Sequence, residues 1–354
     1  EPSMGDILEL DDIHVEFAPD LVDMVLDPGT GLDARIANMR SHVATSFGVL
    51  LPEIRLTDNA ALPPGCYVVH VQGVEQVRDV LKADQILALL NEAEPTDIVC
   101  EHVSEPVYGA PARWIDPDQQ EAAALAGMTT VQPTEVLATH LLEIVKRNFP
   151  RLLTFKALRR RLDEMVNLSD PARAEANRKM LDELIPDKVP IDVLLSVLRM
   201  LLEERVSIRN LPLILEATAE GRQLSQSVDG ITEHVRQRLG FQLVAEMRRP
   251  DGTIPLVQLA PEWEDTFAAY EIRTERGGGD VALPPDNFNQ LADGIAEKLG
   301  QAAEAGAYAA VVTSMRRRRF LRTVMAAKGI MNPVLSFEEI GIDARPALVG
   351  LVPA

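Results

Sequence analysis

Histidine and cysteine are the side chains that most often bind metals or act as nucleophiles, and the chain has six and two of them. No two histidines are spaced as in His-x-x-x-His, and none lies beside a cysteine, so they predict no metal site. His70 lies in a strand pattern and His140 in a helical pattern, which favours structural roles for both. Cys66 and Cys100 are too few for a disulfide framework, and we interpret them as small buried side chains in a reducing compartment.

The short motifs that hold phosphates or activate a serine are missing from the sequence. It has no Gly-x-x-x-x-Gly-Lys-Ser/Thr loop, no Gly-x-Gly-x-x-Gly after a strand and no Gly-x-Ser-x-Gly turn. Paired acids are abundant, but an acidic surface accounts for them without catalysis. We therefore expect a protein that is not an enzyme and holds no cofactor. The alternative from another class is an acidic nucleotide- or metal-dependent enzyme.

Charge excludes further classes of function. The chain has 35 Lys and Arg against 54 Asp and Glu, a formal net charge of −19, whereas binding to nucleic acid or to an anionic membrane needs a positive face. The tract Arg316–Arg319 with Arg322 could suggest nucleic acid, but the acidic balance opposes it. A helical pair that could form a recognition motif also carries acids, at Glu203, Glu204, Glu216 and Glu220. We interpret the tract as a structural helix or a protein contact and expect no nucleic-acid partner.

A second basic run interrupts the acidic balance. Residues 146–161 include seven basic side chains and no acid. This run forms a local positive strip on an otherwise acidic protein.

Helices and strands that must position these residues alternate along much of the chain. Apolar residues recur every three or four positions over 32–47, which predicts a helix that Gly48 ends. A second strong helix begins at Pro133. Residues 84–132 contain short strand-like pieces and several prolines, which is typical of a small inserted unit. Strand patterns before that unit lie at 50–56 and 67–71.

The middle of the chain predicts helices, one over 191–202 and one that begins at Asn210 and Pro212. Strand and helix patterns then alternate again, which predicts an α/β layer at the C-terminal end. The strands are expected at 241–244, 254–259, 308–312 and 333–337, and the helices at 287–303 and 316–327.

The first thirty residues carry nine acids and no Lys or Arg, and they predict an entry segment with one short strand or helix. The chain begins with Glu1 rather than Met, so we expect a processed chain or a fragment of a longer protein. No apolar run approaches the roughly 18 residues that a membrane span needs.

Five segments, in order along nearly the whole chain, carry a resemblance to a known family. They are LPEIRLTDN at 51–59, EPVYGAPARWI at 105–115, VLATHL at 136–141, EERVSIRNL at 203–211 followed by ILE at 214–216, and PVLSFEEI at 333–340. Together they resemble the cytoplasmic domain of the type III secretion export gate family, and within it the flagellar branch more closely. The alternative within the same family is the injectisome, or virulence-type, export gate.

The resemblance implies an α/β multidomain fold made of four small subdomains. These are an α/β subdomain with a small inserted unit, a helical subdomain and a C-terminal α/β subdomain. The implied boundaries are an N-terminal linker segment at 1–30, subdomain 1 at 31–83 and 133–152, subdomain 2 at 84–132, subdomain 3 at 153–240 and subdomain 4 at 241–354.

The resemblance also implies what such a protein does. It would be a docking platform without enzymatic activity, placed at the cytoplasmic face of the bacterial inner membrane and attached there through an N-terminal portion that this chain lacks. Its implied partners are flagellar export chaperones with their late substrates, components of the export ATPase complex and the companion export-switch membrane protein. Copies of the chain would form a homo-oligomeric ring, nonameric in the family.

The chaperone site that the resemblance implies matches Glu105, Tyr108 and Thr139, with a looser match at Pro95. The family often has Asp and Phe at the first two positions, so this chain has a longer acid and an added hydroxyl. The residue types suit docking, because an aromatic beside small residues can anchor a partner and a neighbouring acid can orient it. Trp114, close by in the sequence, is expected to belong to the core.

Overall fold

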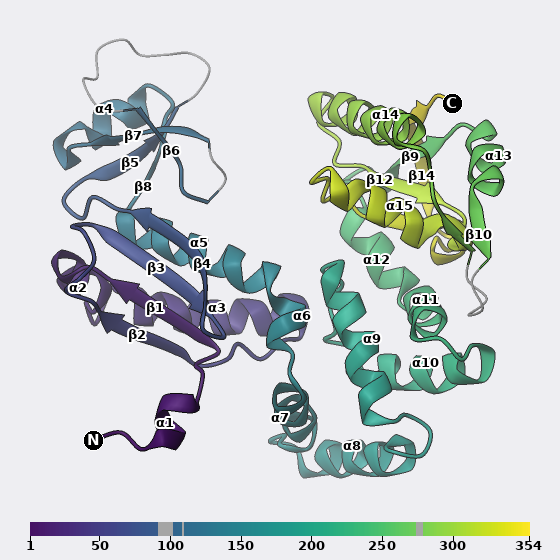
Figure 1. The fold of residues 1–354 in the computed structure, drawn as a ribbon, viewed down its shortest axis with the longest axis horizontal. Coiled ribbons are helices and arrows are strands. Elements are labelled where there is room, and N and C mark those ends of the chain that lie inside the picture. The colour runs from purple at the N-terminus through teal and green to yellow at the C-terminus, as the bar shows by residue number, and fades with distance from the viewer. Residues whose placement is uncertain (91–101, 108–109, 274–278) are drawn as a thin grey trace. The chain divides into compact units, whose positions relative to one another are not determined.

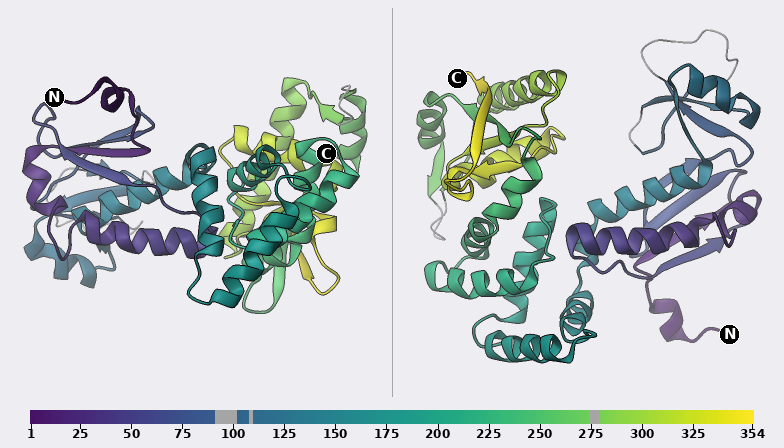
Figure 2. Two further views of the ribbon diagram at one scale, coloured as in Figure 1. Left: turned by 90° about the horizontal axis from the view of Figure 1, so that it is seen from below. Right: turned by 180° about the vertical axis from the view of Figure 1, so that it is seen from behind.

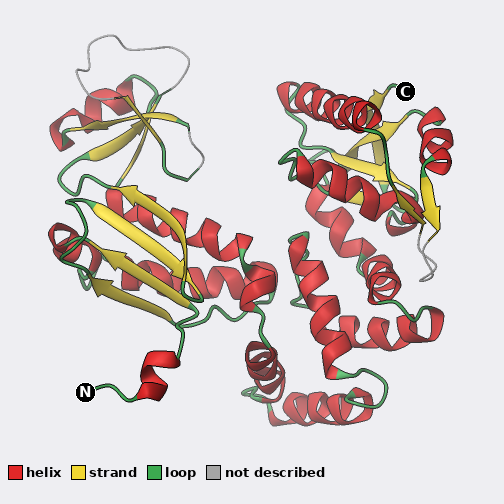
Figure 3. Ribbon diagram, in the orientation of Figure 1, coloured by secondary structure: helices red, strands yellow, loops and turns green. Residues whose placement is uncertain are grey.

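A computed structural model of the chain describes residues 1–90, 102–107, 110–273 and 279–354. Two units divide these residues. Unit 1 contains Glu1–Arg178 and Ser207–Arg209, and unit 2 contains Lys179–Val206 and Asn210–Ala354. Helices and several small sheets share the fold, which confirms the mixed α/β class (Figures 1 and 3). Within the described ranges, no helix is long and apolar enough to cross a membrane.

The first sheet of unit 1 has the strand order β2-β1-β3-β4, in which β1 and β2 are parallel and the other pairs are antiparallel. Gln72 and Gly73 join β3 to β4, and both have positive φ, which is the backbone of a tight two-residue hairpin. The strands are β1 (Ile13–Phe17), β2 (Ile54–Asp58), β3 (Cys66–Val71) and β4 (Val74–Val80).

Two helices cover one face of this sheet. The predicted helix over 32–47 is confirmed as α3 (Leu32–Phe47), and the helix predicted from Pro133 is α5 (Pro133–Arg147). They pack against each other, and the view from behind in Figure 2 shows them side by side across the sheet. Gly48 ends α3 with a left-handed φ of 70°, as predicted.

The first thirty residues contain more structure than the single element expected. A short helix α1 (Met4–Leu8) precedes β1, and two further helical turns, η1 (Pro19–Leu21) and α2 (Val22–Val25), follow it. Because β1 hydrogen-bonds to both β2 and β3, this segment supplies an inner strand of the first sheet. β2 begins four residues later than the predicted strand, after Pro52.

A second, antiparallel sheet in unit 1 has the order β6-β7-β5-β8. Ala88 and Ile115 of this sheet share a small core with Ala123 and Met128. Trp114 is buried, at 5% exposure, as expected. The elements are β5 (Ile86–Leu89), β6 (His102–Ser104), β7 (Pro111–Ile115), η2 (Pro117–Gln119), α4 (Gln120–Leu125) and β8 (Thr129–Val131).

The end of α3 is a junction at which several segments of unit 1 meet. The Phe149 ring of α6 (Phe149–Leu152) lies 5.0 Å from the Phe47 ring, and Arg161 of α7 (Phe155–Val166) donates from Nε to the Gly48 oxygen at 2.9 Å. The segment Ser207–Arg209 also joins here, because Ile208 donates its amide to the Phe47 oxygen at 2.9 Å. We call this meeting point the Gly48 junction. After α7 the chain continues into α8 (Pro171–Leu184).

Four helices begin unit 2 after α8. Asn210 caps α10, since its side chain accepts from the Leu213 amide, as expected from the sequence. The strand predicted at 241–244 is wrong, because these residues lie in α12. Leu243, Val244 and Met247 are buried while Phe241 is exposed, which is a helical spacing that a four-residue apolar run does not reveal. The helices are α9 (Ile191–Glu203), α10 (Leu211–Leu224), α11 (Val228–Arg238) and α12 (Gly240–Met247).

A parallel sheet of order β13-β12-β9-β14 completes unit 2 and confirms the predicted C-terminal α/β layer. Its core includes Trp263 and Phe267, whose rings stack 5.9 Å apart, with aliphatic side chains of α14 and α15. The elements are β9 (Thr253–Leu259), α13 (Glu262–Ala269), β10 (Glu271–Arg273), β11 (Gly279–Val281), α14 (Pro285–Glu304), β12 (Ala310–Thr313), α15 (Met315–Ala327), β13 (Val334–Ser336), η3 (Phe337–Glu339) and β14 (Arg345–Val352).

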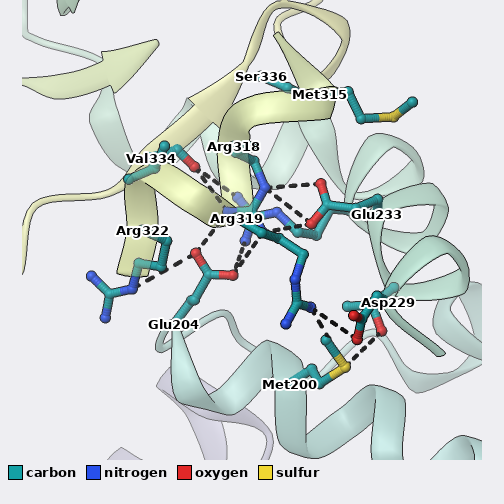
Figure 4. Close-up of polar contacts among 12 residues, drawn as sticks. Met200, Glu204, Asp229, Glu233, Met315, Arg318, Arg319, Arg322, Val334 and Ser336 are labelled. Carbon is teal, nitrogen blue, oxygen red and sulfur yellow. Dashed lines mark hydrogen bonds and ion pairs between the residues drawn. The ribbon is translucent and has the colours of Figure 1, made fainter. Parts of the chain in front are cut away.

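The arginine tract lies in α15, which confirms its interpretation as a structural helix, and two of its members are buried. Arg318 is fully buried between two carboxylates, with Nη2 2.6 Å from Glu233 Oε1 and Nη1 2.7 Å from Glu204 Oε1 (Figure 4). It also donates to the Val334 oxygen at 3.2 Å. Arg317 pairs in the same way with Glu264, at 2.6 Å. These guanidinium groups are used inside the fold and are not presented to a polyanion.

A third buried arginine extends the cluster around Arg318. Arg236 of α11 donates from Nε to Glu339 Oε2 at 2.7 Å, and Glu339 in turn caps η3 by accepting from the Ser336 amide. Burial alone would raise the pKa of Glu204, but the Arg318 hydrogen bonds and the charges of Arg236, Arg318 and Arg322 outweigh it and lower that pKa to about 2. The cluster therefore joins the helices α9 and α11 to the sheet of unit 2 through ionised groups.

Candidate protein-docking site

Four residues carry the chaperone site that the sequence suggests, and the structure describes two of them. Pro95 and Tyr108 lie outside the described residues, as does Cys100. Glu105 follows β6, and Thr139 lies on α5, so both belong to unit 1. Cys66 is a free, buried thiol in β3, which agrees with its interpretation.

Glu105 shapes the turn between β6 and β7. Its Oε1 accepts from the Val107 amide at 2.8 Å, and its own amide donates to the Ala110 oxygen at 2.7 Å. The side chain is only 8% exposed. A carboxylate held in this way fixes the backbone at Val107.

Thr139 has the opposite character, because its side chain is exposed on α5. Its neighbours Val136, Leu137 and His140 are buried, and this pattern fixes which side of α5 faces solvent. A hydroxyl on a rigid helix surface can donate or accept a hydrogen bond without loss of backbone order. The position therefore suits a docking contact.

His140, which follows Thr139 in the chain, forms a buried hydrogen bond that was not predicted from the sequence. The Tyr67 hydroxyl of β3 lies 2.6 Å from His140 Nδ1, and the two rings meet edge to face with centroids 5.8 Å apart. His140 belongs to the VLATHL segment, so a buried histidine next to Thr139 was the available signal. Its partner in β3 lies 73 positions away, which no local pattern could identify.

The same pair connects Glu105 to α5 electrostatically. Burial raises the pKa of Tyr67, and the charges of Asp79 and Glu105 act in the same direction. Burial lowers the pKa of His140, against the opposing charges of Asp79 and Glu105. Burial therefore favours the neutral form of His140, whose Nδ1 forms the hydrogen bond with the Tyr67 hydroxyl.

Substituting Tyr67→Phe is expected to destabilise unit 1 by about 1–3 kcal/mol, because His140 Nδ1 would lose its buried hydrogen-bond partner. The pKa of His140 is lower in the folded chain than its unfolded value near 6.5, so its contribution is present above pH 6.5 and is lost as pH falls through the folded pKa. Urea unfolding between pH 7.5 and 5 measures both effects. Wild-type stability that rises as pH falls over this range would contradict the assignment.

The described residues of the candidate site have side chains that suit docking. Over the ranges that the structure covers, no group of three His, Cys, Asp or Glu side chains is placed to hold a metal ion. The described part of the site includes a turn held by Glu105, an exposed hydroxyl at Thr139 and, next to Thr139 in the chain, the buried His140 that bonds to Tyr67. Such a surface can bind another protein.

Comparison with known proteins gives a family and a fold. A family model described as the FHIPEP family matches residues 1–345. The flagellar biosynthesis protein FlhA of Caulobacter vibrioides is 33% identical over 349 residues, which cover 98% of this chain and 48% of that protein. The FlhA of Bacillus subtilis is 28% identical over 99% of this chain and 50% of its own length. The chain therefore spans about half the length of these curated relatives.

Solved structures show the same fold over nearly the whole chain. The CdsV protein of Chlamydia pneumoniae superposes with a TM-score of 0.79 and 23% identity, covering 96% of this chain and 97% of CdsV. CdsV in its complex with the CdsO protein gives a TM-score of 0.80 over 97% and 98%. The nonameric SctV-C of EPEC gives 0.76 at 18% identity, covering 98% and 99%.

Proposed function

Because the chain belongs to the FHIPEP family, we propose that it is the cytoplasmic docking platform of a flagellar type III protein export gate. In this role it binds export chaperones with their late substrates and hands the substrates to a membrane channel, without catalysing a reaction itself. The observation that carries the proposal is the match to flagellar relatives across both units, at up to 98–99% of this chain. The exposed Thr139 and the turn held by Glu105 support docking as the chemistry of unit 1.

The proposal extends to assembly and to further partners. SctV-C and the EscV cytosolic domain are nonameric, which supports a homo-oligomeric ring for this chain. The complex of CdsV with CdsO supports binding of export-apparatus components, among which we include parts of the ATPase complex and the companion export-switch protein. In the longer protein, an N-terminal portion would hold this ring at the inner membrane.

The second candidate is the injectisome gate of the same family. A probable translocation protein, y4yR of Sinorhizobium fredii, is 27% identical over 96% of this chain. Its lower identity than that of the Caulobacter protein favours the flagellar branch. The fold and the ring would be the same, and the clients would differ.

Calorimetric titration with a flagellar chaperone bound to its late substrate tests the proposal. The wild-type chain is expected to bind, and Tyr108→Ala is expected to weaken binding more than tenfold, about 1.4 kcal/mol, because an aromatic anchor would be lost. The matched control is Tyr308→Ala, which removes an exposed tyrosine of unit 2 and is expected to leave the affinity unchanged. Equal losses of affinity in both variants would contradict a docking role for Tyr108. Binding of injectisome clients without binding of flagellar ones would favour the second candidate function.

A further inference from the structure

Five exposed cations from three consecutive helices of unit 1 remain after the fold and the docking site are accounted for. We call them the basic surface, and they are Arg147, Arg151, Lys156, Arg159 and Arg160. Their neighbours in the same run are used inside the chain, because Lys146 lies 3.2 Å from Glu143 and Arg161 binds the Gly48 oxygen. In the part of the chain that the structure describes, none of the five forms an ion pair with a carboxylate.

The Gly48 junction brings these helices to one end of α3. α6 contacts it through Phe149, and α7 contacts it through Arg161. An aromatic ring lies among the cations, since Phe155 is 49% exposed and the Arg159 guanidinium sits over it, 5.4 Å from the ring centroid. The basic surface therefore combines positive charge with an accessible apolar anchor.

Helix stability does not explain Lys156 of α7, whereas Arg159 and Arg160 have acids four positions on, at Asp163 and Glu164. Arg147 and Arg151 lie at helix C-termini, where positive charge is favourable, but Lys156 lies in the first turn of α7, where it is unfavourable and no acid offsets it. Lys156 is also three and four positions from Arg159 and Arg160, so like charges repel along one face. Charge placements that lower helix stability in this way are typical of surfaces that serve binding.

We propose that the basic surface binds a short acidic segment of a partner protein, in which Asp and Glu residues flank one apolar side chain that packs on Phe155. The net charge of −19 selects this occupant over DNA or an anionic bilayer. DNA and bilayers are extended, so part of their negative charge would lie near acidic residues elsewhere on the chain and be repelled by them. A short segment meets only the local positive field, because salt screens charges beyond about 8 Å at physiological ionic strength.

The experiment measures fluorescence anisotropy of a short labelled peptide of Asp and Glu with one central Leu, added to the full chain. The wild type is expected to bind, and raising salt from about 50 to 200 mM is expected to weaken binding. Lys156→Glu/Arg159→Glu/Arg160→Glu is expected to bind at least tenfold more weakly. An acid in the first turn of α7 favours the helix, so this variant is expected to fold, and thermal melting checks it.

The matched control has the same change in net charge at exposed cations elsewhere, Arg173→Glu/Lys179→Glu/Lys328→Glu. It is expected to bind the peptide within about twofold of wild type, since none of its three positions belongs to the basic surface. An equal loss in the control, or no binding by wild type, overturns the proposal. So does preferential binding of anionic vesicles or DNA at the same residues, or a change in oligomeric state of the α7 variant without peptide binding by wild type. Chaperone binding uses other residues, so it can fail or succeed independently.

Discussion

Arg318→Ala is expected to lower the unfolding free energy of unit 2 by about 3–5 kcal/mol. Arg318 is fully buried, and its removal would take the cation from between Glu204 and Glu233, leaving Glu204 only its longer contacts with Arg236 at 3.7 Å and Arg322 at 3.9 Å. The cost arises mainly from those stranded charges rather than from the lost ion pair. Urea unfolding followed by Trp263 fluorescence reports on unit 2, while Trp114 reports on unit 1, and the chain has no other tryptophan.

Arg319→Ala is the matched control, because it removes the next arginine of the same helix. Arg319 is 43% exposed and lies 3.4 Å from Asp229, so its loss is expected to cost less than about 1 kcal/mol. Combining Arg318→Met with Glu204→Gln and Glu233→Gln is expected to recover part of the loss, since neither of the two carboxylates next to position 318 would then carry a charge. Equal effects of Arg318→Ala and Arg319→Ala would show that the buried cluster does not hold unit 2 together.

Gly48→Ala is expected to destabilise unit 1 by about 3–5 kcal/mol. An added Cβ would press on the backbone of Arg209 at Cα and N and lie 2.7 Å from the Ile208 carbonyl carbon. Backbone cannot rotate away as the end of a side chain can. The left-handed φ of 70° adds strain of its own. Chemical denaturation followed at Trp114 measures the loss.

Gly329→Ala separates the two contributions to this loss. Gly329 has the same φ of 70°, but no heavy atom lies within 4 Å of an added Cβ. It is therefore expected to cost only the conformational strain, about 1–2 kcal/mol, measured at Trp263. If the two substitutions cost the same, the close approach of Arg209 to Gly48 is not a tight contact in solution.

Local signals predicted the elements that have a long period and a defined end. α3 matches its predicted bounds because five apolar positions share one face and Gly48 supplies the left-handed residue that ends it. α12 was predicted as a strand because a short apolar run does not distinguish strand from helix. Local sequence patterns could not predict the tertiary hydrogen bonds, because Arg318 and Glu204 lie 114 positions apart in the chain and Tyr67 and His140 lie 73 apart.

In the candidate docking site, too, the sequence predicted some features and not others. The segment resemblance identified Glu105 and Thr139 as neighbours in function, and the structure gives them different physical characters. Glu105 is buried because its carboxylate satisfies the amide of its own turn, which spacing along the chain does not reveal. Thr139 is exposed on α5 although it lies three positions after the buried Val136 and directly before the buried His140, so the apolar spacing alone does not predict its exposure.

The Gly48 junction has a consequence for how the chain acquires its structure during synthesis. Arg209 donates to the Thr45 oxygen across 164 positions, so the helix α3 leaves the ribosome long before its last partner is made. At about 5–20 residues per second, that interval is on the order of 10–30 s. Until then the carbonyls at the end of α3 face water and the Phe47 ring lacks part of its cover. The N-terminal half of the nascent chain is therefore completed by a segment that is translated after the last helix of that half. Premature termination before Ser207 would leave the fold of this half incomplete.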